Sequence, residues 1–205
     1  MHGLAPILLY LLRCGYRIGN KPATMKKILR LLFVFGLFAG AYGQGFGAEK
    51  VRLPGLSLEN LYRIDSGVYR SDQPTRADFA VLTGYGMAEV LNLRHFHSDG
   101  PGAEGTPLVL HRIRSHAHSI DSAQLVEAMR IIRDRKGPIL IHCWHGSDRT
   151  GAVVALYRMV FQHVPREQAI REMTGGGFGF HRIFGHIVDT LRKIDIEAVR
   201  RELGI

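Results

Sequence analysis

The feature that most constrains this chain is a run of aliphatic residues that leads directly into a cysteine. Residues 138–142 read PILIH, and Cys143 follows at once. A short, uniformly apolar run is typical of a strand that is covered on both faces of its sheet. Apolar residues resume after Arg149, which predicts a helix over residues 149–162. The cysteine is therefore expected between the end of a central strand and the start of a helix.

The rest of the chain predicts alternating strands and helices. We expect a hairpin over residues 59–74, strands over 87–94 and 108–114, and helices over 76–86, 122–137, 165–173 and 180–203. Thr75 is placed to cap the first helix, and Asp121 with Gln124 has the form of a capping box for the second. This order predicts one α/β domain, with a central, mainly parallel sheet flanked by helices. In such folds ligands bind at the carboxyl ends of the central strands, where Cys143 is expected.

The first 48 residues differ in composition from the rest, and we place the folded domain at residues 49–205. All 18 acidic residues occur from Glu49 onward, whereas six of the 27 basic residues precede it. The formal charge of +9 therefore falls to +3 over the rest of the chain, which argues against nucleic acid as a partner. A short basic start at Met25, an apolar run over residues 31–42 and the small residues Ala41 and Gly43 are typical of a secretory signal peptide.

We therefore expect translation to start at Met25, with residues 1–24 as an upstream extension, and export to the periplasm with removal of the leader. The apolar run is short for a membrane span, so no stable span is expected after cleavage, and an uncleaved N-terminal anchor is the alternative. Cys14 would leave with the leader, so Cys143 would remain without a disulfide partner. A lone cysteine in an oxidising compartment points to a chemical role.

The residues around Cys143 are suited to hold a tetrahedral oxyanion. Gly146 allows the loop backbone to turn its N–H groups inward, and the following helix adds its positive N-terminal end. Arg149 can donate two parallel hydrogen bonds to a phosphate. In this field Cys143 is expected to react as a thiolate, which predicts nucleophilic attack on phosphorus.

The pattern His-Cys-x5-Arg-Thr-Gly at residues 142–151 resembles the signature of the cysteine-dependent protein tyrosine phosphatases. The stretches VYRSDQP at residues 68–74 and VLNLR at residues 90–94 resemble the compact dual-specificity branch of that superfamily. The resemblance covers roughly residues 60–195. It implies a dual-specificity phosphatase-like fold and phosphomonoester hydrolysis without a metal or other cofactor.

The same resemblance implies a role for each residue of the loop. Cys143 would be the nucleophile that forms a phosphocysteine, and Arg149 would bind the phosphate and the transition state. His142 and Thr150 would support the loop and the thiolate. The residues that would contact the substrate are Trp144, His145, Gly146, Ser147 and Thr150. Trp144 and His145 occupy the variable positions of the loop, and packing beneath it is the alternative for their side chains.

This sequence departs from the family pattern at the position of the general acid. The family usually supplies an aspartate on a loop about thirty residues before the cysteine, but no carboxylate lies between Glu104 and Asp121. We predict that Asp148 is the acid, and its other interpretation is an ion pair with Arg149. Asp121 is an alternative acid, although the capping box also accounts for it. The histidines at positions 116 and 118 are further alternatives.

Several alternatives concern the substrate and the site. A phosphorylated protein is the expected substrate, and a phosphoinositide, an inositol phosphate or an envelope lipid is the alternative, because exported proteins meet few phosphoproteins. A phosphate-binding pseudophosphatase, a structural buried cysteine and a rhodanese-like sulfur carrier are rival interpretations of Cys143. Arg70 and Arg94 would line the phosphate entrance or form ion pairs. Residues 175–182 would be a flap or a tight turn, and the histidines lack metal-ligand spacing.

Overall fold

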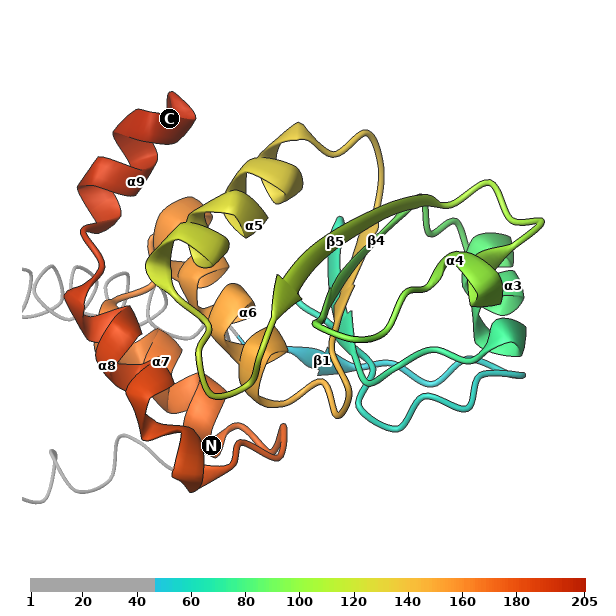
Figure 1. Ribbon diagram of the computed structural model, residues 1–205, viewed down its shortest axis with the longest axis horizontal. Coiled ribbons are helices and arrows are strands. Elements are labelled where there is room, and N and C mark those ends of the chain that lie inside the picture. Colours follow the sequence, from blue (N-terminus) through green and yellow to red (C-terminus); the bar gives the residue numbers. More distant parts are fainter. Residues whose placement is uncertain (1–46) are drawn as a thin grey trace, which may run out of the picture. The chain divides into compact units, whose positions relative to one another are not determined.

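The computed structural model describes residues 47–205, so the predicted extension and leader over residues 1–46 lie outside the described residues. Figure 1 shows the strands of the described chain, which join in one sheet in the order β1-β2-β3-β6-β4-β5. Their bounds are β1 (Glu49–Lys50), β2 (Tyr62–Arg63), β3 (Val68–Ser71), β4 (Glu89–Arg94), β5 (Val109–Ser115) and β6 (Ile139–His142).

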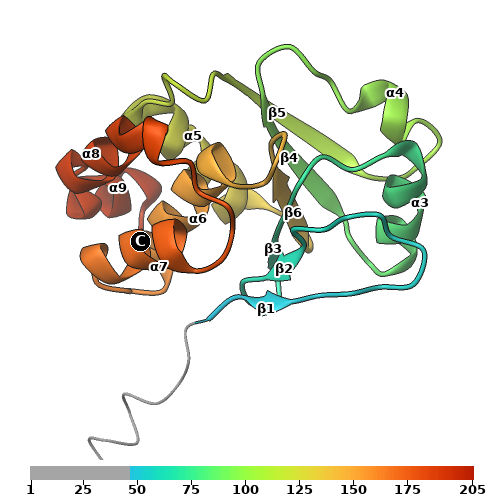
Figure 2. The same ribbon diagram turned by 90° about the horizontal axis from the view of Figure 1, so that it is seen from below.

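Helices cover both faces of this sheet (Figure 2). One face carries α3 (Arg76–Gly84) and α4 (Gly100–Ala103). The other carries α5 (Ser122–Asp134), α6 (Asp148–Phe161), α7 (Arg166–Gly175), the short 3₁₀ turn η1 (Arg182–Phe184), α8 (Gly185–Lys193) and α9 (Ile196–Leu203). Over residues 47–205, no helix combines the length and the apolar character needed to cross a membrane.

The strand that precedes Cys143 is central, as the sequence predicts. β6 pairs in parallel with β3 on one side and with β4 on the other, and β4 pairs in parallel with β5. Ser71 and Asn92 both lie opposite His142, so β3 and β6 end at the same level, and β4 continues two residues further to Arg94. The two N-terminal strands pair antiparallel, which makes the sheet mixed.

The side chains of β6 alternate between two apolar clusters because successive residues of a strand point to opposite faces. Ile139 and Ile141 join the larger cluster, which also contains the buried residues of α5 and α6. Leu140 joins the smaller cluster with Phe79 and Leu82 of α3. All three β6 side chains are completely buried, and each contributes about 1.5–3 kcal/mol to folding. Burial on both faces fixes the position of the loop that follows.

Both predicted N-caps are present, and each forms a capping box. The Thr75 side chain accepts from the Asp78 backbone and Asp78 reciprocates at the start of α3, while Asp121 and Gln124 do the same at the start of α5. The single helix predicted over residues 180–203 is wrong. The chain forms η1, α8 and α9 instead, because Ile194 is extended and Asp195 starts a new helix by accepting a hydrogen bond from the Ala198 backbone. Residues 95–107, which join the two predicted strands 87–94 and 108–114, contain the short helix α4.

Candidate active site

Cys143 lies at the base of a loop between β6 and α6. Its side chain is buried, and α6 begins five residues later at Asp148. Ser147 occupies the N-cap position of α6 but forms no side-chain cap hydrogen bond. The first N–H groups of α6 are therefore not capped by this side chain, and the positive N-terminal end of the helix faces the loop.

The carbonyl groups of three successive loop residues point outward, away from the centre of the loop. The Trp144 carbonyl accepts from the Gln73 backbone at 3.1 Å. The His145 carbonyl accepts from Asn60 Nδ2 at 2.8 Å, and the Gly146 carbonyl accepts from Arg70 Nη2 at 2.5 Å. A peptide plane that turns its carbonyl outward turns its N–H inward. The loop thus presents a ring of donors to its centre, which suits a tetrahedral oxyanion.

Gly146 is required by the geometry of this loop. Its φ angle is +69°, a region in which an L side chain is strained. A Cβ atom at this position would lie 2.7 Å from the backbone nitrogen of Asp72 and closer still to the Ser71 carbonyl. Both the conformation and the close approach of β3 therefore exclude a side chain.

One nitrogen of the Arg149 guanidinium is hydrogen-bonded, and another has no partner. Its Nη1 donates to the Leu93 carbonyl at 3.2 Å and to the Ser115 carbonyl at 2.8 Å. Its Nε is buried and has no hydrogen-bond partner. A buried donor without a partner is costly, and a bound oxyanion would satisfy it. The phosphate-binding role of Arg149 stays a prediction, and the unpartnered Nε is a donor that such a role would use.

His142 is oriented by Asp99, which was not among the predicted site residues. Its Nε2 lies 2.8 Å from Asp99 Oδ2, and its Nδ1 lies 3.2 Å from the Cys143 carbonyl. Gln73 donates to the other oxygen of Asp99 and accepts from Arg94. Burial acts to raise the pKa of Asp99, but the hydrogen bonds from His142 and Gln73 outweigh it and hold that pKa below its ordinary value. Asp99 is thus a carboxylate that fixes the ring behind the cysteine.

Asp148 contacts neither Arg149 nor an open site, in contrast to both predictions for it. Its side chain is buried. One carboxylate oxygen accepts from the His181 backbone N–H and the other lies against the His181 ring, each at 2.9 Å. The carboxylate therefore serves as an acceptor that ties the start of α6 to the chain before η1. The geometry does not favour the predicted general-acid role, because both oxygens are already engaged.

Residues 175–182 pack against the loop and are not a free flap. Phe178 is buried, lies under the guanidinium of Arg70 at 4.0 Å and packs edge-on against Tyr62. Its carbonyl accepts from Asn60, the same side chain that holds the His145 carbonyl. Burial lowers the pKa of Arg70 to about 10, and the nearby Cys143 charge acts in the opposite direction. Arg70 is therefore a structural support of the loop rather than part of its entrance.

Three other candidate residues are Asp121, Thr150 and Ser147. Asp121 is exposed, and the N-cap of α5 accounts for it. The Thr150 hydroxyl is buried and has no hydrogen-bond partner, and Ser147 is also buried. Within residues 47–205, no three His, Cys, Asp or Glu side chains are grouped in a way that could hold a metal ion.

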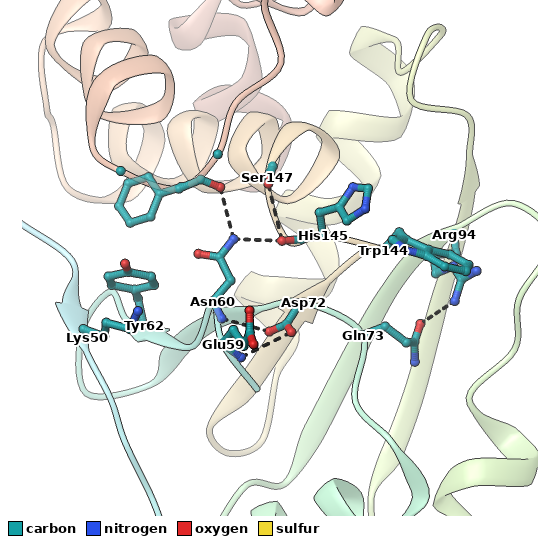
Figure 3. Close-up of a pocket in the computed structure, with 13 residues that line it drawn as sticks. Lys50, Glu59, Asn60, Tyr62, Asp72, Gln73, Arg94, Trp144, His145 and Ser147 are labelled. Atoms are coloured by element: carbon teal, nitrogen blue, oxygen red, sulfur yellow. Dashed lines mark hydrogen bonds between the residues drawn. The ribbon is translucent and has the colours of Figure 1, made fainter. Parts of the chain in front are cut away.

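A cavity of about 580 Å³ adjoins the outer side of the loop (Figure 3). Trp144 and His145 line it and are exposed, and Trp144 stacks on the guanidinium of Arg94 at 4.1 Å. Burial and the neighbouring charge of Arg149 lower the pKa of Arg94. The other residues that line the cavity are Lys50, Glu59, Asn60, Tyr62, Asp72, Gln73, Ser147 and Gly177 to Gly179. The guanidinium groups of Arg94 and Arg149 thus lie near each other and near Cys143. A bound anion would offset the repulsion between these two positive charges.

The site combines a buried cysteine, loop N–H groups that point inward, and an arginine whose Nε has no hydrogen-bond partner. These features define a cysteine-dependent phosphatase site. Comparison with known proteins agrees. Residues 64–162 match a family model described as a polymorphic toxin system, DSP-PTPase phosphatase. The dual specificity protein phosphatase TpbA of Pseudomonas aeruginosa is 31% identical over 143 residues, which cover 69% of this chain and 65% of TpbA.

Two further comparisons extend this finding. A crystal structure of P. aeruginosa TpbA in complex with pTyr aligns with a TM-score of 0.68 and 28% identity, over 79% of this chain and 98% of that one. The inositol diphosphatase DSP2 of Oryza sativa subsp. japonica is 30% identical over 112 residues, which cover 48% of this chain and 53% of DSP2. The chain spans 65% of the length of TpbA, and these comparisons together support a compact cysteine-dependent phosphatase of the dual-specificity type.

Proposed function

We propose that this chain hydrolyses phosphomonoesters in two steps through a phosphocysteine, as a tyrosine or dual-specificity phosphatase. One observation carries the proposal. Cys143 is buried at the base of a loop whose carbonyls point outward, and the Arg149 Nε beside it has no partner. These groups are complementary to a phosphate that is attacked by sulfur.

In the first step the Cys143 thiolate would attack phosphorus, and the bond between phosphorus and the leaving oxygen would break. The charge on the three equatorial oxygens would be held by the loop N–H groups and by Arg149. In the second step a water oxygen would attack phosphorus, and the sulfur–phosphorus bond would break to restore the thiolate. Inorganic phosphate is the product.

A phosphotyrosyl or phosphoseryl protein is the substrate class that we favour, and the crystal structure of TpbA with pTyr supports it. An inositol phosphate is the second candidate. The relationship to a rice inositol diphosphatase supports it, as do Lys50 and Arg94, the two cations that line the cavity beside the loop.

The test is turnover by the purified full chain with phosphopeptides and inositol phosphates offered at equal concentration. We expect release of inorganic phosphate that Cys143→Ser abolishes, while Cys143→Ser still binds the preferred substrate. Turnover that survives Cys143→Ser would show that the mechanism is wrong. Phosphate release from inositol phosphates alone would assign the second substrate class.

The cellular location is a separate proposal, because it rests on residues 25–43, outside the described residues. We propose export to the periplasm with cleavage just before Gln44. Expression of the full chain with cell fractionation and N-terminal sequencing tests it. Intact residues 25–43 in soluble cytosolic protein would contradict export, and their retention in the membrane fraction would indicate an anchor.

A further inference from the structure

A phosphatase that acts on poor leaving groups needs a proton donor at the mouth of its loop, because the leaving oxygen departs opposite the attacking sulfur. The aspartates near the loop are already engaged. Asp99 holds His142, Asp148 holds His181, and Asp72 accepts from two backbone N–H groups. Asp121 is the N-cap of α5. The candidate donors are therefore Glu59, an exposed carboxylate that lines the cavity, and side chains that are not carboxylates.

An irregularity in the sheet places a histidine near Arg149. Asn92 pairs with Arg112, but Arg94 pairs with Ser115, so β5 has one residue more than β4 in this interval. Such a bulge re-aims the end of a strand. The two carbonyls at this bulge, those of Leu93 and Ser115, are the ones that hold Arg149. His116 follows Ser115 directly, so it leaves the sheet beside the phosphate-binding arginine.

The ring of His116 is held at this place by aromatic contacts. It stacks on His95 with the ring centroids 3.7 Å apart and 21° between the planes. Phe96 contacts it edge-on at 5.4 Å, and His118 stacks on it more loosely at 5.2 Å. The His116 side chain is half-buried, whereas His118 and Phe96 are exposed. His95 comes two residues after Leu93 and His116 one after Ser115, so the stacked pair rises from the two strand ends that anchor Arg149.

We propose that His116 is the general acid of the phosphatase reaction, in a proposal that rests on the function proposed above. In the first step the Cys143 sulfur forms its bond to phosphorus, and the electron pair of the broken phosphorus–oxygen bond remains on the leaving oxygen. The His116 imidazolium gives its proton to that oxygen, which leaves as an alcohol or phenol. In the second step neutral His116 takes a proton from the attacking water, whose oxygen bonds to phosphorus as the sulfur departs. The imidazolium and the thiolate are then restored.

The surroundings of His116 set the pH dependence of this step. Partial loss of contact with water lowers the pKa of His116, and the neighbouring His95, His118 and Arg149 lower it further. The acid form is therefore populated below the ordinary histidine pKa of about 6.5. In kcat/KM, which reports the free enzyme, we expect activity to fall as the pH rises through a value below about 6.5.

The experiment compares wild type, His116→Gln and His118→Gln on aryl phosphates whose leaving groups range from p-nitrophenol to phenol. We expect His116→Gln to lose roughly 10²–10⁴-fold in kcat on the poorest leaving group and far less on p-nitrophenyl phosphate. The basic limb of the pH–rate profile should disappear in the same variant. His118→Gln, the matched control on the same loop, should change neither. His116→Asp, which restores a proton donor, should recover part of the loss on the poor leaving group.

Inhibition by inorganic phosphate shows that each variant retains a folded site. A uniform loss on all leaving groups in His116→Gln would overturn the proposal. So would a leaving-group dependence that follows Asp148→Asn, Asp121→Asn or His118→Gln instead. Either result, with turnover still abolished by Cys143→Ser, removes only the acid assignment. Turnover that does not depend on Cys143 removes the proposed function itself.

Discussion

His142 and Asp99 form a buried pair, with 2.8 Å between the imidazole Nε2 and a carboxylate oxygen, although 43 residues separate them in the chain. The other ring nitrogen, Nδ1, lies 3.2 Å from the Cys143 carbonyl oxygen. Gln73 joins the same carboxylate to Arg94 at the edge of the cavity. The loop is therefore supported from below by a continuous set of polar contacts, and this support can be tested apart from the chemistry.

Removing Asp99 should destabilise the fold. Asp99→Ala leaves His142 buried without its partner, so we expect the free energy of unfolding to fall by about 1–3 kcal/mol. Urea denaturation measures it. Glu104→Ala is the control, because Glu104 is exposed and pairs with Arg76 at the surface, where about 0.5 kcal/mol or less is expected. Equal stability of the two variants would show that the buried pair contributes nothing.

The same pair predicts how stability depends on pH. The pKa of Asp99 is lower in the folded chain than its ordinary value of about 3.9. The stabilisation is therefore complete above about pH 4 and is lost as the pH falls through the folded-state pKa. We expect the difference in unfolding free energy between wild type and Asp99→Asn to narrow below about pH 4. A difference that stays constant down to pH 2 would contradict this linkage.

Alanine substitutions at Gly146 and Gly177 distinguish the cost of backbone strain from the cost of steric conflict. Both have positive φ angles, +69° and +82°, but a Cβ would meet the β3 backbone only at Gly146 and nothing within 4 Å at Gly177. Gly177→Ala should cost about 1–2 kcal/mol of stability and leave turnover close to wild type. Gly146→Ala should cost more and abolish turnover, because the loop must move away from Ser71. Thermal denaturation and aryl phosphate hydrolysis test both, and matching behaviour of the two variants would rule out the steric account.

Arg149→Lys should reduce kcat by roughly 10²–10³-fold even though the positive charge remains. A lysine ammonium cannot bond two strand carbonyls and also offer two parallel donors to a phosphate. Steady-state kinetics with an aryl phosphate measure the loss. Arg114→Lys is the control, since Arg114 is exposed near the end of the same strand that supplies the Ser115 carbonyl. Activity of Arg149→Lys near wild type would show that the bidentate contact is not needed.

Asp148→Asn should lower activity equally for good and poor leaving groups, because the carboxylate positions the start of α6 through His181. His181→Ala removes the ring contact from the other side. We expect the double variant to be no worse than the more impaired single variant, since the two residues act as one unit. Additive losses, or a leaving-group dependence in Asp148→Asn, would show that Asp148 acts on the substrate directly.

The strand–loop–helix unit around Cys143 could be predicted from the sequence because its determinants are local. A uniformly apolar run implies a central strand, Gly146 allows the tight loop, and apolar residues after Arg149 imply a helix. The N-cap at Thr75 and the capping box of Asp121 with Gln124 were also predictable, since each motif spans only a few residues. The same local pattern failed at Asp195, where one side chain starts a new helix inside a continuous amphipathic stretch.

Contacts between distant segments were decided only by the tertiary structure. The sequence could not show that Asp99, from a loop rich in glycine, reaches His142, or that Asn60 and Arg70 hold the carbonyls of residues 145 and 146. It also could not show that Asp148 turns toward His181, because an aspartate beside an arginine suggests a local ion pair. A bulge between β4 and β5 places His116 beside Arg149, and a bulge depends on the pairing of two strands. The local pattern thus determines the cysteine and its loop, whereas the groups that orient the loop come together only when the sheet brings distant strand ends to one edge.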